Sequence, residues 1–355
     1  MTGVLEALAT RPVVVVCGAG GVGKTTVAAA IGVGLAARGA RVCVVTVDPA
    51  RRLAGALGID TPSDVPVEVM GPWSGRLEAV QLHAGSTFDS LIRRHATSDA
   101  QAEAIRRNPL YRSLATALGG TQEYMAMERL YELHHAEQYD VVVVDTPPTR
   151  SALELLDAPA RLLRFLQHKV VRAILAPTRF SLRAASAATS AFLRGTAAVV
   201  GGDLVDDAVA FFQAFAGMQE GFAQRAADVQ RLLEAPETAY VLVTTPAEDA
   251  TEEAAWFTQH LADRGIEPAA AVVNRCHPSF IDDGRVLPAL AGVVGAQLRT
   301  LETLERAAQR DREVVEAVTV LFSGAAVSSV ALAPAPTRDV HGLGEVAAQL
   351  ADANG

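Results

Sequence analysis

A glycine-rich segment near the start of the chain has the spacing of a phosphate-binding loop. The segment GAGGVGKTT runs from Gly18 to Thr26, after the apolar run Val13–Cys17 and before the helical pattern Val27–Arg38. It matches G-x-x-x-x-G-K-[ST] in the required order of strand, loop and helix. In such a loop successive backbone N–H groups face the phosphates, and the following helix contributes its positive N-terminal end. The pattern predicts a site for a nucleoside triphosphate.

The side chains of this loop have distinct expected roles. Lys24 should reach the β- and γ-phosphates, and the Thr25 hydroxyl should bind Mg²⁺. The residues expected to contact the nucleotide here are Gly20, Gly21, Val22, Gly23, Lys24, Thr25 and Thr26.

Two aspartates stand at the ends of other apolar runs. VVVVDTPP ends a run at Asp145, where a carboxylate is expected to hold the Mg²⁺ shell, and VVTVDPARR ends another at Asp48, which suits orienting the attacking water. An aspartate at a strand end often serves only as a cap. Beside a phosphate loop, two of them favour a catalytic site. We expect Lys24, Asp48 and Asp145 to be catalytic, and Thr25, Asp48 and Asp145 to be the metal ligands.

Short valine-rich runs alternate with longer helical patterns along the chain. Runs without polar alternation are typical of strands buried on both faces, and their alternation with helices predicts right-handed crossovers. We therefore expect an α/β fold with a doubly wound, mostly parallel sheet, whose ligand lies at the carboxyl ends of the strands. The expected strands are Val13–Cys17, Val42–Val47, Leu77–Leu82, Val141–Asp145, Tyr240–Thr245, Ala269–Asn274 and Val327–Ala333.

Two helical stretches interrupt this alternation, at about 87–136 and 153–233. Neither contains a convincing strand, and no low-complexity linker separates them from the rest. We expect one P-loop ATPase domain over residues 1–355, with these stretches inserted into it as a helical subdomain.

Composition restricts the class of protein. The chain has 355 residues, 50% of them hydrophobic, which excludes a wholly disordered chain. Its formal net charge of −9 argues against nucleic-acid binding. Three scattered cysteines fit neither a disulfide framework nor a CxxC metal site, and the first ten residues lack the basic region of a secretory signal. We expect a cytoplasmic protein, with peripheral membrane association as a further option.

Four motifs in order closely resemble the ArsA family of ATPases: GAGGVGKTT, DPARRLAGALG, DTPPT and VVNRC. That family includes arsenite-pump ATPases and the ATPases that target tail-anchored membrane proteins. The resemblance implies ATP and Mg²⁺ as cofactors, a nucleotide enclosed at a dimer interface, and switch loops that move a helical subdomain. It places Asn274 at the family's adenine-contacting asparagine, and Asp48 and Asp145 at its two switch aspartates.

The chain departs from the family in its phosphate loop and in both switch segments, which read DPARR, with Arg51 and Arg52, and DTPPTRS, with Arg150. The family's loop reads GKGGVGKT, with an early lysine that crosses the dimer, where this chain has Ala19. Losing a cation aimed at the transferring phosphoryl group could cost orders of magnitude in rate. Either Arg51, Arg52 or Arg150 replaces that charge, or a paralogous partner supplies it in trans. The simpler alternative is that these arginines lie in solvent or form local ion pairs.

The inserted helices indicate which client, the molecule that such an ATPase would move, is compatible with this sequence. They carry no cysteine, which disfavours arsenite transport. An apolar series fits either the hydrophobic client groove that the resemblance implies or an ordinary buried helix face. The stretch Pro159–Gly202 contains basic but no acidic residues, so it fits an anionic lipid surface, an acidic partner or a solvated face. The apolar series is Phe192, Phe211, Phe212, Phe215, Met218 and Phe222.

The function that we expect is a Mg²⁺-dependent ATPase of the ArsA type. Its nucleotide cycle would open and close a homodimer, or a heterodimer with a paralogous ATPase, and would move a hydrophobic or membrane-associated client. Two alternatives stay open: a catalytically weak nucleotide-binding subunit that regulates or completes a lysine-containing paralog, and a membrane-positioning ATPase.

Overall fold

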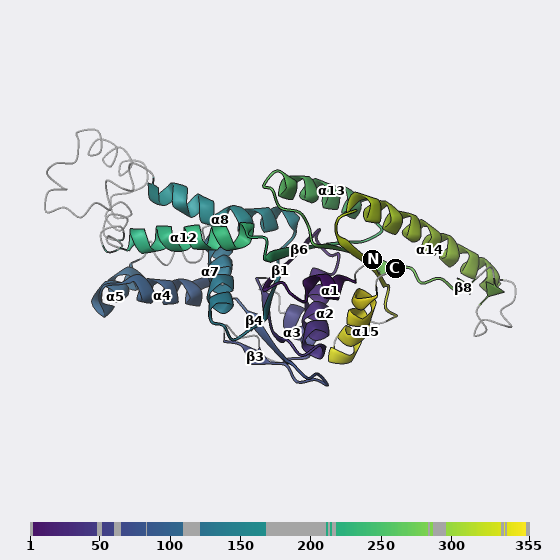
Figure 1. Ribbon diagram of the computed structural model, residues 1–355, viewed down its shortest axis with the longest axis horizontal. Coiled ribbons are helices and arrows are strands. Elements are labelled where there is room, and N and C mark those ends of the chain that lie inside the picture. The colour runs from purple at the N-terminus through teal and green to yellow at the C-terminus, as the bar shows by residue number, and fades with distance from the viewer. Residues whose placement is uncertain are drawn as a thin grey trace. The chain divides into compact units, whose positions relative to one another are not determined.

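Figure 1 shows the computed structural model of the chain. The structure describes residues 3–47, 52–59, 65–82, 84–108, 121–167, 211, 214, 218–282, 285–286, 296–334, 337 and 339–352.

The chain divides into two compact units. The sheet unit comprises Met1–Gln81, Leu133–Ala152 and Glu234–Gly355, and the helical unit comprises Leu82–Glu132 and Leu153–Leu233. Each unit therefore draws on segments that are far apart in the sequence.

An eight-stranded sheet forms the centre of the sheet unit, in the order β10-β7-β6-β1-β5-β2-β4-β3. All neighbouring strands pair in parallel except β3 and β4, which are antiparallel. The expected doubly wound, mostly parallel α/β sheet is thus confirmed. The strands are β1 (Val13–Gly18), β2 (Arg41–Thr46), β3 (Val67–Glu68), β4 (Arg76–Gln81), β5 (Val141–Asp145), β6 (Thr238–Thr244), β7 (Ala270–Cys276) and β10 (Ala326–Ala331). A separate two-residue pair is formed by β8 (Ile281–Asp282) and β9 (Arg285–Val286).

Helices cover both faces of this sheet (Figure 1). Alternate valines of the central strands pack into one apolar cluster with the helices of one face, whereas α13 and α14 contact β6, β7 and β10 from the other. Strands that are covered on both faces must be apolar throughout, which explains the continuous valine runs. The helices of the first face are α1 (Val4–Leu8), α2 (Lys24–Ala37) and α15 (Val340–Ala351), and those of the second are α13 (Glu248–Ala262) and α14 (Ala296–Leu321). A short helix, α3 (Arg52–Leu57), follows β2 in the chain.

The helical unit has a core of its own. Its cluster joins Leu91, Ile105 and Tyr124 to Phe211, Met218 and Phe222. Three of the six residues considered for a client groove are therefore buried, as expected for an ordinary helix face; Phe192, Phe212 and Phe215 lie outside the described residues. The helices of this unit are α4 (Ala84–His95), α5 (Asp99–Arg107), α7 (Thr121–His135), α8 (Thr149–Gln167) and α12 (Gln219–Glu234), of which α7, α8 and the last residue of α12 extend into the sheet unit.

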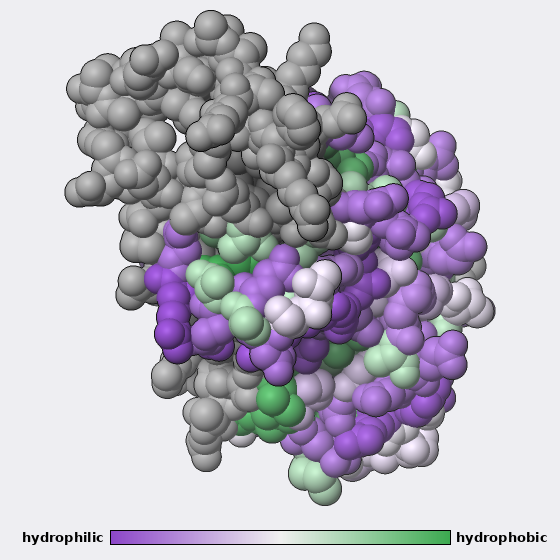
Figure 2. All heavy atoms as spheres, turned by 90° about the vertical axis from the view of Figure 1, so that its left-hand side faces the viewer, coloured by the Kyte–Doolittle hydropathy of each residue, from purple (hydrophilic) through white to green (hydrophobic). Residues whose placement is uncertain are grey.

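The surface shown in Figure 2 is mainly hydrophilic where its residues are described, and hydrophobic side chains form small, separate patches there. Among the described helices, none combines the length and apolar character needed to cross a bilayer.

Candidate functional site

The phosphate loop connects the end of β1 to the start of α2. A side chain at Gly18, the last residue of β1, would place its Cβ 2.1 Å from the carbonyl oxygen of Val243 on β6. Only glycine therefore fits at this position. Gly23 has a φ of 97° and precedes the first residue of α2. This left-handed conformation, which glycine adopts without a steric penalty, turns the chain directly into the helix. The backbone thereby presents the loop at the N-terminal end of α2.

Lys24 is buried at the base of this loop, with only 7% of its surface exposed. Its Nζ donates a 2.8 Å hydrogen bond to the carbonyl oxygen of Ala19, within the same loop. Burial lowers the pKa of Lys24 below the ordinary lysine value, and the nearby Asp145 carboxylate partly opposes that shift. The ammonium group is thus held close to the loop whose N–H groups are expected to bind phosphate.

Two hydroxyl groups converge on the carboxylate of Asp145. The Thr25 hydroxyl donates to Oδ2 of Asp145 at 2.8 Å, and the Thr46 hydroxyl donates to the same oxygen at 2.9 Å. Asp145 pairs with Val16 of β1 on one side and Thr46 of β2 on the other, so these strand ends are level. The structure thereby brings the two predicted metal ligands of β5 and α2 together.

These donor atoms suit a magnesium ion. Mg²⁺ prefers oxygen ligands and is usually bound by one or two protein side chains together with substrate phosphates and water. Thr25 and Asp145 provide a hydroxyl and a carboxylate oxygen within 2.8 Å of each other, at the end of a phosphate loop. The residues present therefore fit Mg²⁺ with a nucleotide.

Asn274, at the carboxyl end of β7, connects that strand to the phosphate loop. Its Nδ2 donates to the carbonyl oxygen of Val22 at 2.7 Å, and its Oδ1 accepts from the backbone N–H of Arg275 at 2.9 Å. A Cβ on Gly23 would lie 2.2 Å from the same Nδ2. The predicted nucleotide contact is thus within reach of the loop, and its amide also fixes the loop's shape.

Several predicted residues cannot be placed. Asp48 and Arg51 lie outside the described residues, and the side chain of Arg150, in the first turn of α8, is not described either. Arg52 begins α3 and is exposed; its positive charge contributes to the lowered pKa of Lys24. Of the three arginines proposed to replace the missing lysine, Arg52 is the one whose charge can be related to the loop.

Sequence reasoning missed two residues at this site. Thr46 shares the Asp145 oxygen with Thr25, and the Thr146 hydroxyl donates to the carbonyl oxygen of Val16 at 2.8 Å, which ties β5 to β1 beyond their paired residues. Each threonine directly ends or follows an apolar run. A polar, β-branched residue at that position was the available signal.

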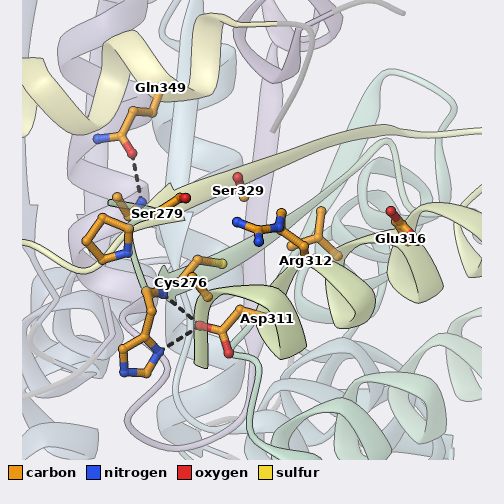
Figure 3. A pocket seen from close by; sticks show the side chains of 12 residues that line it. Cys276, Ser279, Asp311, Arg312, Glu316, Ser329 and Gln349 are labelled. Atoms are coloured by element: carbon orange, nitrogen blue, oxygen red, sulfur yellow. Dashed lines mark hydrogen bonds and ion pairs between the residues drawn. The ribbon is translucent and has the colours of Figure 1, made fainter. Parts of the chain in front are cut away.

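A cavity of about 310 Å³ lies beyond β7, between α14 and β10 (Figure 3). Cys276 lines it together with Asp311 and Arg312 of α14, Ser329 of β10 and Gln349 of α15. Burial raises the pKa of the Cys276 thiol to about 12, so this thiol is not a reactive one.

Comparison with known proteins agrees with this geometry. The family of anion-transporting ATPases, the ArsA ATPases, matches residues 11–352 of the chain. A Streptomyces coelicolor protein designated uncharacterized protein SCO2128 is 31% identical over 288 residues, which is 81% of this chain and 67% of that protein.

Two relatives with functional names match a shorter part. ATPase GET3 of Malassezia globosa is 32% identical over 149 residues, covering 42% of this chain and 43% of that protein. A putative arsenical pump-driving ATPase of Chlorobaculum tepidum is 29% identical over 145 residues, covering 40% of this chain and 34% of that protein. The match thus spans less than half of either named ATPase. Because the family's sequence pattern covers nearly the whole chain, the protein belongs to the ArsA family of P-loop ATPases.

Proposed function

We propose that this protein is a Mg²⁺-dependent ATPase whose nucleotide cycle opens and closes a dimer. The observation that carries the proposal is the contact between Thr25 and Asp145 beside the buried Lys24. A loop that served only as a turn would not need a buried ammonium, a hydroxyl and a carboxylate at one strand edge, since burying charged groups is costly. Membership of the ArsA family supports the same conclusion.

Each side chain has a definable task in that reaction. Lys24 would neutralise phosphate charge, and Thr25 and Asp145 would hold Mg²⁺, which when bound neutralises charge on the phosphates. Thr46 keeps the Asp145 carboxylate oriented through its 2.9 Å hydrogen bond. We assign Asp48 the positioning of the attacking water, on its place in the sequence and the family resemblance.

The early family lysine is replaced by Ala19, which is 7% exposed and packs into the apolar cluster of the sheet unit. A second cation at the phosphates would have to come from another residue or another chain. We propose Arg52 for this role, because it is exposed at the start of α3, the helix that follows β2, whose Thr46 bonds to Asp145. The second candidate, which the alanine at position 19 favours, is a subunit that a lysine-containing paralog completes in trans.

We propose that the dimer acts on a hydrophobic or membrane-associated client through the helical unit. Phe211, Met218 and Phe222 are buried in its core, so they are not a ready-made client surface. The client surface would have to form when the nucleotide changes the arrangement of these helices. In α8, within the stretch Pro159–Gly202 that contains no acidic residue, Arg161 is partly buried and Arg164 is exposed, which leaves Arg164 available to an acidic partner or lipid.

ATP turnover by the purified chain, measured over a range of protein concentrations, tests the proposal. Lys24→Ala is the inactive comparison, and Arg52→Ala tests the replacement cation. Arg38→Ala, at the opposite end of α2, is the matched control.

For a self-sufficient dimer, we expect turnover per subunit to rise with concentration, to vanish in Lys24→Ala and to fall at least about tenfold in Arg52→Ala. Tight ATP binding without turnover at any concentration would instead support the subunit that needs a paralog. Absence of ATP binding by the unmodified chain would refute the proposed function.

A further inference from the structure

Arg275 follows Asn274 at the end of β7 and has an unusual backbone conformation. Its φ is 63°; among the described residues, only Glu137 is a second non-glycine residue with positive φ. Such a conformation is unfavourable for a long side chain and persists only where the surroundings enforce it. Strained residues of this kind concentrate at functional sites.

The surroundings of Arg275 do enforce it. Val330 of β10 pairs with Asn274, but the next residue, Ala331, pairs with Cys276, so Arg275 is an extra residue in its strand. The backbone N–H of Leu332 donates to the carbonyl oxygen of Cys276 at 2.7 Å, which fixes the pairing beyond the bulge. Bulges of this type redirect one side chain and are frequent next to active sites.

The residues on both sides of Arg275 are anchored. Before it, Asn274 bonds to the phosphate loop. After it, the backbone N–H and Nδ1 of His277 lie 2.7 and 2.8 Å from Oδ2 of Asp311 on α14, the two contacts drawn at Asp311 in Figure 3. Arg275 itself is exposed, and its guanidinium makes no hydrogen bond or ion pair with the described residues. The fold thus fixes this backbone while leaving its cationic side chain available.

The bulge also decides which way the side chains point. Side chains alternate along a regular strand, so without the extra residue Arg275 would face α14 and Cys276 would face the side of Asn274. With it, Cys276 lines the cavity against Asp311 of α14. Arg275, the extra residue, lies near the carboxyl end of β7, at the edge of the sheet where ligands of such sheets bind.

The strand order indicates which part of a nucleotide Arg275 would meet. β5, which carries Asp145, adjoins β1 on one side, whereas β6 and then β7 lie on the other. A nucleotide whose metal-binding phosphates lie toward Asp145 therefore extends its nucleoside toward β7. Asn274 contacts the loop at Val22, and β7 lies two strand spacings, about 10 Å, from β1 on the side away from Asp145, so Arg275 lies toward the base rather than toward the metal-binding phosphates.

We propose that the guanidinium of Arg275 stacks on the base of the bound nucleotide, an inference that rests on the proposed function. A guanidinium is planar, always charged and stacks on aromatic faces. It donates hydrogen bonds but accepts none, so a face-on contact does not depend on the donors and acceptors of one particular base. Arg275 would therefore strengthen nucleotide binding without selecting the base.

The test compares Mg²⁺-ATP, Mg²⁺-ADP and Mg²⁺-tripolyphosphate binding by calorimetry. Arg275→Asn removes the guanidinium but tolerates positive φ, so the bulge should persist. We expect this variant to bind ATP and ADP about tenfold more weakly, with unchanged tripolyphosphate binding. Its thermal unfolding midpoint should equal or exceed that of the unmodified protein. Arg38→Asn, an exposed arginine at the far end of α2, should change none of these affinities.

Two results would overturn the inference: unchanged ATP affinity in Arg275→Asn, or an equal loss for tripolyphosphate, which would put the guanidinium on the phosphates. Failure of the proposed function has a different signature, since the unmodified chain would then bind none of the three ligands or Lys24→Ala would bind them equally well.

Discussion

The Thr25 hydroxyl donates a 2.8 Å hydrogen bond to Oδ2 of Asp145, although 120 positions separate the two residues in the chain. The contact exists because β1 and β5 pair directly, so the loop after one strand meets the last residue of the other. Asp145 is only 1% exposed, and a buried carboxylate needs partners of this kind. The same oxygen atoms are those that a Mg²⁺ ion would use.

Asp145→Asn should weaken Mg²⁺ binding while leaving the fold intact. Asparagine has the same size and its Oδ1 can still accept from Thr25 and Thr46, but it lacks the negative charge that attracts Mg²⁺. We expect ATP turnover to fall about a hundredfold or more and nucleotide affinity to lose its dependence on Mg²⁺. Asp140→Asn is the matched control, because Asp140 precedes the same strand but forms an exposed pair with Arg41. Unchanged Mg²⁺ dependence in Asp145→Asn would exclude Asp145 as a metal ligand.

The pH dependence of nucleotide binding should report the state of Lys24. Burial lowers its pKa below the ordinary 10.5, so the ammonium is lost earlier than in an exposed lysine. ATP affinity should therefore decline as pH rises through the lowered pKa. The free energy of unfolding should instead increase with pH between the lowered pKa and 10.5. In this range the unfolded chain still binds the Lys24 proton, whereas the folded chain has released it.

Lys24→Arg supplies the comparison for that titration, since a guanidinium keeps its charge throughout this range. Its ATP affinity should stay level from neutral pH to about 10, whatever its absolute value. Calorimetric titrations of both proteins at matched ionic strength measure the difference. A decline of equal size in both would assign it to another group.

The fold was predictable because the evidence for it is local. Continuous valine runs specify buried parallel strands, and the phosphate loop specifies a strand before it and a helix after it. Strand ends were less certain: β7 extends to Cys276 rather than Asn274, because β10 pairs with the residues after the bulge. The bulge at Arg275 depends on the register of two strands more than 50 positions apart, so no local pattern could predict it. Thr46 was missed for the same reason, since its role depends on a neighbouring strand.

Three glycines of the phosphate loop should respond differently to alanine. At Gly20 an added Cβ meets nothing within 4 Å, so Gly20→Ala should change stability by no more than about 0.5 kcal/mol. Gly21 also has open space but a φ of 80°, which should cost about 1 kcal/mol. Gly23 combines a φ of 97° with a Cβ 2.2 Å from Nδ2 of Asn274.

Gly23→Ala should therefore destabilise most, by about 2–4 kcal/mol, because Asn274 must also give up its bond to Val22. Urea unfolding of the three variants measures the series. Equal losses at Gly21 and Gly23 would mean that Asn274 moves aside at no cost and does not fix the loop.

A buried ion pair should stabilise the helical unit against unfolding. Glu128 of α7 is fully buried, and its Oε1 accepts from Nε of Arg225 on α12 at 2.7 Å. The guanidinium of Arg225 also lies 4.1 Å above the ring of Tyr131, and Arg94 of α4 lies 3.7 Å from the same carboxylate oxygen. Burial raises the pKa of Glu128, and Arg225 opposes this shift. Arg225 is thus the principal partner of a carboxylate that cannot reach water.

Arg225→Ala should destabilise the protein by about 3 kcal/mol, since removing one partner leaves the other charge buried. Arg231→Ala, on the same helix, removes an exposed arginine paired with Asp228 and should cost no more than about 0.5 kcal/mol. The penalty of Arg225→Ala should shrink on acidification, because a protonated Glu128 no longer needs a cation. Unfolding of both variants at neutral and mildly acidic pH measures this. A penalty that is the same at both pH values would show that Arg225 stabilises the unit by packing on Tyr131 rather than by pairing with Glu128.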